Sequence, residues 1–274
     1  LALAWTFALQ VGLALSIILA ARRSFPWPVG VAVAFLVGIL AFEQRETLAL
    51  IVFLWCAMAI RGDVGDRLGR VLVPLAGLVC AVALLTKVNV GILCVLMTVV
   101  AVWWLPPGRW RALGVHAASG VASFAVLWLL AGGSVGQIAP WISRAGQTAS
   151  GFTGALPAED AARGWEYPAF ILLVAGMAFL AWLHGERSGR WRAWCLVAIS
   201  VVMAFGYFKH GFVRHDFEHS LYTFIVLMAA PVAVVWRGTA GRIAGASLPA
   251  VVRQMTTMQR GRRGEHTRRG PGVR

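Results

Sequence analysis

Charged side chains are scarce in this sequence, and acidic ones most of all. Of the 274 residues, 11 are Asp or Glu and 25 are Lys or Arg, so 13% are charged while 59% are hydrophobic. Soluble globular domains carry about 25% charged residues. The shortage argues against a water-soluble domain and indicates a protein that spends much of its surface in lipid.

Cysteine motifs are absent as well. Cys56, Cys80, Cys94 and Cys195 all fall inside apolar runs, and no two of them form a Cys-x-x-Cys pair. We therefore expect them to be small core residues that imply neither a disulfide nor a bound metal ion.

A cleavable signal peptide is also missing from the start of the chain, which has neither a basic n-region nor a small-residue cleavage site. The chain opens with Leu1 inside an apolar run. We therefore expect a further segment upstream of this residue.

What the sequence has in abundance is long apolar runs. Because lipid offers backbone groups no hydrogen-bond partner, and because the runs lack the alternation of barrel strands, they predict helices. The fold class is all-α: a polytopic transmembrane bundle of about nine spans over residues 1–236, with a long connection at 132–167. The nine runs are 1–21, 29–42, 47–60, 71–86, 89–105, 112–131, 168–184, 192–208 and 220–236.

Two of these runs, 29–42 and 47–60, are short. A helix of about 14 residues is about 21 Å long, against a hydrocarbon core of about 30 Å. They predict either tilted helices around a thin or water-filled region or a re-entrant hairpin.

The charges predict the sides of the membrane. If every run spans, one set of connections carries 19 Lys or Arg and the other 6. The basic set, which includes the segment 237–274, is expected on the cytoplasmic side of the plasma (inner) membrane. We expect 237–274 to be a disordered basic tail that binds anionic lipid headgroups. Nucleic acid is not expected as a partner, because the tail lacks interleaved aromatic residues.

Two tight turns on the opposite, extracytoplasmic side hold unusual charges. Residues 42–46 include Glu43 and Glu46, which are either interfacial charges that touch headgroups or acids beside a cavity that act as base or metal ligand. Residues 86–89 include Lys87 and Asn89. Lys87 either extends to the interface or binds a phosphate as a point charge.

The long connection 132–167, on the same side, is rich in glycine and carries aromatic residues. Loops of this length without secondary structure are usually functional or disordered. Its Trp141 and Trp165 predict either membrane anchors at the interface or surfaces on which a sugar stacks.

The densest polar stretch, 209–219, holds seven ionisable side chains in eleven residues. It is either a solvated loop or part of a site. As a site, Lys209 and Arg214 would bind a phosphate or carboxylate, and Asp216 would act as an acid or base.

A second interpretation of this stretch is a zinc site. His215, Glu218 and His219 have the H-x-x-E-H spacing of inverted zinc peptidases. If the last span began near Phe212, the two histidines would lie one turn apart on one helix face. A third zinc ligand is not evident in the sequence.

The chain with these features resembles the GT-C type of polytopic glycosyltransferases. The resemblance rests on the many spans, the extracytoplasmic polar groups, the turn at 86–89 and the Lys/Arg/His-rich stretch at 209–219. Residues 211–216 also resemble a stretch of uncharacterised bacterial membrane proteins. The GT-C resemblance implies a polyprenyl-phosphate sugar donor bound from the membrane on the outer face. In that superfamily an acid of the first outer loop acts as base or metal ligand, a position that only Glu43 and Glu46 can take here.

The sequence therefore predicts a membrane glycosyltransferase that modifies a cell-envelope glycan, lipid or protein. The residues expected to bind substrate are Lys87, Asn89, Lys209, Arg214, His215, His219, Trp141 and Trp165. Asp216, Glu43 and Glu46 are the candidate catalytic residues, and a divalent cation is left open as cofactor. The alternatives are a non-enzymatic transporter or lipid-binding protein, and a membrane zinc peptidase.

Overall fold

A computed structural model gives the architecture of the chain. It describes residues 2–22, 25–40, 46–64, 66–103, 108–155, 158–159, 164–215, 221, 223–224 and 227. All of them belong to one compact unit, Leu1–Val235. The predicted basic tail, 237–274, lies outside the described residues.

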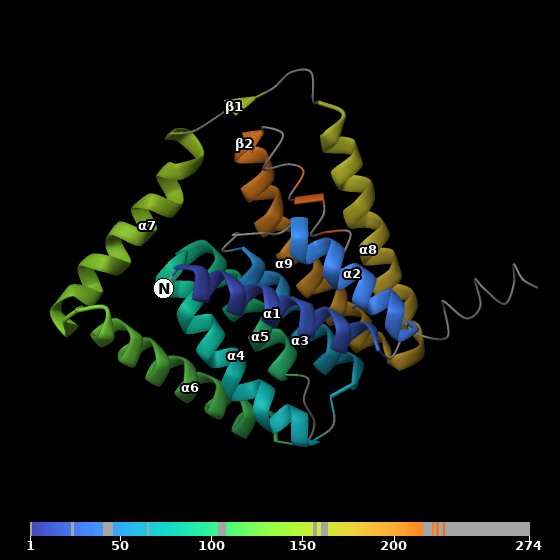
Figure 1. Cartoon of the computed structure of the whole chain (residues 1–274), viewed down its shortest axis with the longest axis horizontal. Coiled ribbons are helices and arrows are strands. Elements are labelled where there is room, and N and C mark those ends of the chain that lie inside the picture. The colour runs from blue at the N-terminus through green and yellow to red at the C-terminus, as the bar shows by residue number, and fades with distance from the viewer. Residues whose placement is uncertain are drawn as a thin grey trace, which may run out of the picture. The chain divides into compact units, whose positions relative to one another are not determined.

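The described chain is helical except for one short pairing of extended segments (Figure 1). The helices, in order, are α1 (Ala2–Ala21), α2 (Trp27–Leu40), α3 (Thr47–Arg61), α4 (Asp66–Thr86), α5 (Val88–Trp103), α6 (Arg109–Leu130), the 3-10 turn η1 (Val135–Gln137), α7 (Ile138–Ala155), α8 (Glu166–Ser188) and α9 (Arg190–Val213). The extended segments β1 (Ala158–Glu159) and β2 (Arg214–His215) pair in parallel.

Helix α3 lies in the centre of the bundle. It contacts α1, α4, α5 and α9, and its large side chains, such as Phe53, Leu54 and Met58, are fully buried. Helix α1 is tied to it by a hydrogen bond from Trp55 Nε1 to Ser16 Oγ (2.9 Å). Helix α2 packs against α1. One of the two short runs, 47–60, therefore forms the core of the bundle. Its shortness does not mean that it lies at the periphery.

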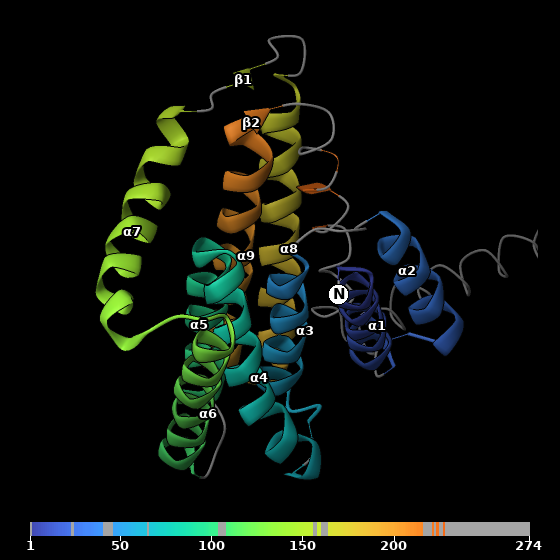
Figure 2. The same ribbon diagram turned by 60° about the vertical axis from the view of Figure 1, so that its left-hand side comes forward.

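The contacts fix the direction of each helix along the bundle. Trp103 and Trp110 meet where α5 ends and α6 begins (5.1 Å between ring centroids), and Trp182 and Trp194 meet where α8 and α9 join (5.1 Å). The side chain of Arg192 lies beside Gly62, just after α3. The start of α9 is therefore at the end of α3, and the starts of α4 and α6 lie at this same end (Figure 2).

Many large apolar side chains point outward from the helices. Phe7 is 71% exposed, Leu172 73% and Phe205 62%. Within the described residues, five helices are long and apolar enough to cross a membrane: Ala4–Ala21, Leu68–Thr86, Arg109–Leu130, Glu166–Leu183 and Arg190–Lys209. The protein is thus a helical bundle whose apolar helices are compatible with membrane insertion, whereas the count of about nine spans is not confirmed. Three further apolar helices are shorter (Trp27–Val37, Thr47–Arg61 and Val88–Trp103).

Two segments differ from the sequence prediction. The connection 132–167, expected to lack secondary structure, contains η1 and the helix α7. Trp141 of α7 packs on Phe124 and Trp128 of α6, with ring centroids 5.6 Å apart in both pairs. The stretch 209–219 is also not a loop at its start, because α9 continues through Val213.

Candidate functional site

The centre of the candidate site is an ion pair between Glu46 and Lys87. Glu46 comes directly before α3, and Lys87 is the single residue between α4 and α5. The Lys87 ammonium group contacts Oε1 of Glu46. Gly91 makes so tight a turn possible, since a Cβ there would lie 2.5 Å from the backbone of Leu84. The tight turn puts the lysine at the tip of the α4–α5 hairpin, where its side chain extends across to α3.

The two partners of this ion pair differ in their exposure to solvent. The Glu46 side chain is 7% exposed and the Lys87 side chain 38%. The carboxylate lies at the amino end of α3, where a negative charge is favourable beside the helix dipole. The site is therefore a buried acid with a cation that other groups can also reach.

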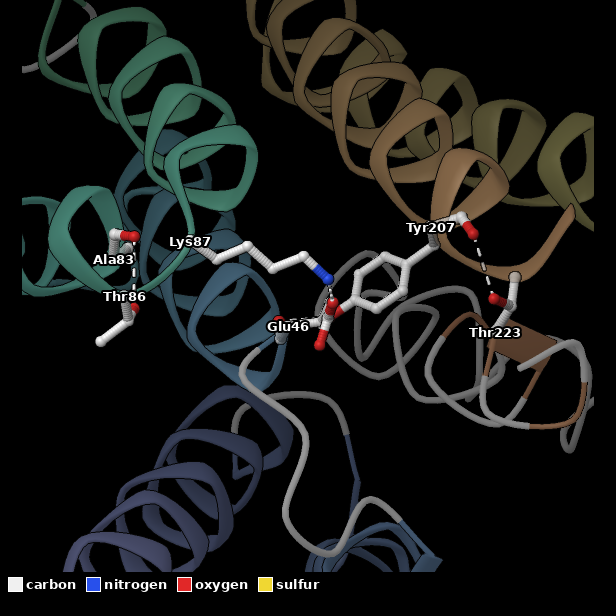
Figure 3. A network of polar contacts seen from close by, with 6 residues as sticks. All are labelled: Glu46, Ala83, Thr86, Lys87, Tyr207 and Thr223. Carbon is white, nitrogen blue, oxygen red and sulfur yellow. Dashed lines mark hydrogen bonds and ion pairs between the residues drawn. The ribbon is translucent and has the colours of Figure 1, made fainter. Parts of the chain in front are cut away.

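A second contact positions Glu46 from the opposite direction (Figure 3). The hydroxyl of Tyr207 in α9 donates a hydrogen bond to the backbone carbonyl oxygen of Glu46 (2.7 Å). Thr223 in turn donates from its hydroxyl to the carbonyl oxygen of Tyr207 (3.0 Å). Tyr207 and Thr223 are fully buried. The end of α9 and Thr223 thus hold the backbone of Glu46 in place at the start of α3.

An aromatic cluster borders this network. Phe212 of α9 lies 4.9 Å from Phe208, 4.9 Å from Tyr167 and 5.3 Å from Phe170, measured between ring centroids, and 6.4 Å from Phe224. The cluster joins the start of α8 to the end of α9. It holds the last turns of α9, in which the polar stretch 209–219 begins.

The backbone pairing of β1 and β2 joins this stretch to the long connection. Ala158 is opposite Arg214, and Glu159 is opposite His215. His215 is therefore in an extended segment and not on a helix, so the expected one-turn spacing of His215 and His219 on a helix face is wrong at its first residue. Two extracytoplasmic segments of the prediction, 132–167 and 209–219, meet here through their main chains.

The other predicted site residues with described side chains lie in α5, in α7, in α9 and directly before α8. Asn89 is half-buried in the first turn of α5, and Lys209 is half-buried in α9 two residues after Tyr207. Trp165 precedes α8 and is 65% exposed, whereas Trp141 is engaged in packing against α6. Of the predicted residues, the structure brings Glu46 and Lys87 into direct contact.

Several predicted residues fall outside the described part of the chain. Glu43, Asp216 and His219 are among them, and so is Glu218. Arg214 and His215 are described only by their backbone. Within the described ranges, no group of three His, Cys, Asp or Glu side chains could hold a metal ion.

Sequence reasoning missed Tyr207 and Thr223. Both lie within or beside apolar runs, where an isolated tyrosine or threonine is ordinary. The one available signal was that Tyr207 lies two residues before the start of the polar stretch, within the last turn of a predicted span.

A second buried polar cluster joins α4, α5 and α6. Thr98 Oγ1 lies 3.1 Å from His116 Nε2 and 3.7 Å from Cys80 Sγ, and His116 Nδ1 lies 3.4 Å from the carbonyl oxygen of Val73. When Nδ1–H donates to the carbonyl oxygen of Val73, Nε2 is an acceptor for the Thr98 hydroxyl. The proton of that hydroxyl also has two acceptors within its own helix, the carbonyl oxygens of Cys94 (2.9 Å) and Val95 (3.0 Å). This cluster connects three helices within the bundle.

Comparison with protein-family models found no match, and neither the curated proteins nor the solved structures gave one.

Proposed function

We propose that this protein is an integral membrane glycosyltransferase of the GT-C type, which uses a polyprenyl-phosphate sugar on the extracytoplasmic face. The observation that carries the proposal is the pairing of Glu46 with Lys87 at one end of an apolar bundle. Sugar transfer from a phosphate-linked donor needs a base for the acceptor hydroxyl and a cation for the departing phosphate.

The two side chains divide the chemistry between them. Lys87, whose side chain is 38% exposed, binds the donor phosphate as a point charge. The Glu46 carboxylate accepts the proton of the acceptor hydroxyl while the acceptor oxygen attacks the anomeric carbon. The bond from that carbon to the phosphate oxygen breaks, and polyprenyl phosphate leaves with the bonding electrons. Attack opposite the leaving group inverts the configuration of the anomeric carbon.

Further residues predicted from the sequence complete the proposed site. Lys209 and Arg214, at the end of α9 and in β2, are assigned to the donor phosphate. Glu43 and Asp216 keep their predicted roles as further acids, either as base or as ligand of a divalent cation. Tyr207 is assigned as a positioning residue, because its hydroxyl holds the backbone of Glu46.

The charge at the other end of the bundle supports the sidedness. The helix ends that are remote from Glu46 carry Arg61, Arg70, Arg109 and Arg190. Arginine-rich ends face the cytoplasm in most membrane proteins. The Glu46–Lys87 pair then faces the extracytoplasmic side, where polyprenyl-linked sugars rather than nucleotide sugars serve as donors.

The test is sugar transfer by the purified full-length protein, with a panel of polyprenyl-phosphate sugars and a cell-envelope acceptor fraction. In Glu46→Gln the transfer rate should fall by about 10²- to 10⁴-fold while donor affinity stays within about threefold. Lys87→Met should lose donor affinity as well. Arg144→Gln, an exposed arginine of α7, is the matched control and should behave as wild type.

Two results would contradict the proposal. Wild-type transfer by Glu46→Gln would remove this carboxylate as the base. Donor binding without transfer of any sugar in the panel would favour the lipid-binding alternative.

A further inference from the structure

The end of the bundle remote from Glu46 carries a concentration of arginines. Arg61 ends α3, Arg70 lies in the first turns of α4, and α6 and α9 begin with two arginines each. The end of α3 and the starts of α4, α6 and α9 lie at the same end of the bundle. The reason is that α4, α6 and α9 run in one direction, whereas α3 and α5 run in the opposite direction. The arginines concerned are Arg61, Arg70, Arg109, Arg111, Arg190 and Arg192.

Negative charge hardly balances this end. Among the side chains described there, Asp63 is the one acid, and its carboxylate lies 2.7 Å from the guanidinium of Arg61. Both side chains of that pair are almost fully buried. Arg109, Arg111 and Arg190 are exposed. The exposed charged side chains described at this end are therefore positive.

Arg109 has a fixed orientation that suits a phosphate. Its guanidinium carbon lies 4.8 Å from the ring centroid of Trp103 and 5.9 Å from that of Trp110. Contacts with two indole faces hold the guanidinium group, while the N–H donors at its edge stay available. Among the described residues, Arg109 makes these two ring contacts and no hydrogen bond or ion pair. A guanidinium with a free edge binds phosphate oxygens bidentately.

The same end also carries a belt of exposed tryptophans. Trp110 is 64% exposed, Trp191 70%, Trp194 52% and Trp103 45%. Exposed tryptophans beside arginines and next to apolar helix faces are typical of the boundary between headgroups and hydrocarbon. A soluble acidic partner would match the charge but leave the indoles and the apolar faces in water.

From this arrangement we propose that the arginine end binds the phosphate headgroups of anionic phospholipids, with Arg109 held between Trp103 and Trp110 as its principal phosphate ligand. The arginines of this surface belong to other parts of the sequence than the segment 237–274, and they lie at the end of the bundle opposite the proposed sugar-transfer site. It ties the protein to the anionic lipid of one leaflet, whichever reaction the opposite end performs.

The experiment compares binding of phosphatidylglycerol and phosphatidylcholine to the full chain in a neutral detergent. Each lipid carries the same fluorescent acyl chain, and the ratio of the two Kd values measures selectivity. We expect Arg109→Gln to lower the preference for phosphatidylglycerol about fivefold, and Arg109→Gln with Arg111→Gln about 25-fold. Added salt should lower the preference in wild type, since exposed charges are screened.

Three further variants make the outcome specific. Arg144→Gln removes an arginine remote from this end and should leave the preference unchanged. Arg109→Lys keeps the charge but loses the planar donor edge, so its preference should lie between those of wild type and Arg109→Gln. Trp103→Leu should reduce the preference by releasing the guanidinium. An unchanged preference in folded Arg109→Gln, with an unaltered unfolding midpoint, would overturn the proposal and assign the selectivity to another basic segment.

Discussion

The hydroxyl of Tyr207 donates a hydrogen bond of 2.7 Å to the carbonyl oxygen of Glu46, which lies 161 residues earlier in the chain. The same oxygen accepts the amide N–H of Ala49 (2.9 Å) as α3 begins. The first turn of α3 is thus held by its own backbone and by α9. This double attachment aims the Glu46 side chain at Lys87, since it fixes the residue from which the carboxylate departs.

Replacing Tyr207 by Phe should destabilise the bundle by about 1 kcal/mol, the usual net value of one hydrogen bond. The ring stays in place, so the loss reports the hydroxyl alone. Unfolding in a titration with SDS, followed by circular dichroism, measures the change.

Thr86→Val is the control for this variant. It also removes one hydroxyl, but among the described residues the partners of Thr86 Oγ1 are the carbonyl oxygens of Val82 and Ala83 in its own helix. We expect almost no change there. Equal losses in both variants would show that the Tyr207 contact does not join α9 to α3.

The Glu46–Lys87 pair should show a large coupling energy in a double-mutant cycle. Lys87→Met removes the Lys87 cation from a largely buried carboxylate, and we expect a loss of about 2 kcal/mol, less than for a fully buried pair because the lysine is partly exposed. Glu46→Gln with Lys87→Met should recover most of this loss. The measurement is again the free energy of unfolding in SDS.

One outcome of the double-mutant cycle would contradict the contribution of the ion pair. If the two single losses simply add in the double variant, the side chains do not interact and the ion pair makes no contribution. Repeating the cycle at high salt gives a further check, because a pair shielded on one side is screened less than an exposed one.

Hydropathy was enough to predict most of the helices. Eight of the nine apolar runs correspond to helices, with ends shifted by a few residues, because length and apolarity decide which segments lie in lipid. Of the ninth run, 220–236, the structure describes four residues. The helix α7 was missed because its sequence is rich in glycine and polar residues. What orders it is the packing of Trp141 on α6, a tertiary contact that no local pattern reveals.

The candidate site was predictable only in part. Glu46 and Lys87 stood out because charge is costly in tight turns between apolar runs. Their contact could not be derived, since it depends on which helices are neighbours in the bundle. Tyr207 could not be singled out either, because its role depends on a backbone carbonyl 161 residues away.

Thr98→Val should destabilise the bundle by about 1 to 2 kcal/mol. The substitution keeps the shape of the side chain but leaves Nε2 of buried His116 without its hydroxyl partner at 3.1 Å. The cost arises because an unsatisfied polar atom among α4, α5 and α6 cannot turn to water. SDS unfolding of the purified protein measures it.

Thr98→Ser retains the hydroxyl and separates this effect from packing. It should lose less than Thr98→Val although it removes a methyl group. The reverse order would mean that the methyl group of Thr98 matters and its hydrogen bond to His116 does not.

Helices α4 and α6 approach each other closely at Gly77. A Cβ at this position would lie 2.5 Å from the carbonyl oxygen of His116 and 2.9 Å from the amide nitrogen of Gly120. Both atoms belong to the backbone of α6, so a side chain cannot be accommodated by a rotamer change. Close approach through small residues is how membrane helices gain packing energy without a hydrophobic driving force.

Gly77→Ala should therefore separate α4 from α6 and cost about 1 to 3 kcal/mol, the usual range for overpacking, despite the higher helix propensity of alanine. Gly114→Ala in α6 is the matched control, because its Cβ would meet nothing within 4 Å. The control should be neutral or stabilise the protein by up to about 1 kcal/mol. SDS unfolding compares the two, and a cysteine crosslink across the α4–α6 contact reports their separation. If Gly77→Ala were as stable as Gly114→Ala with the crosslink intact, α4 and α6 could not be in backbone contact at this position.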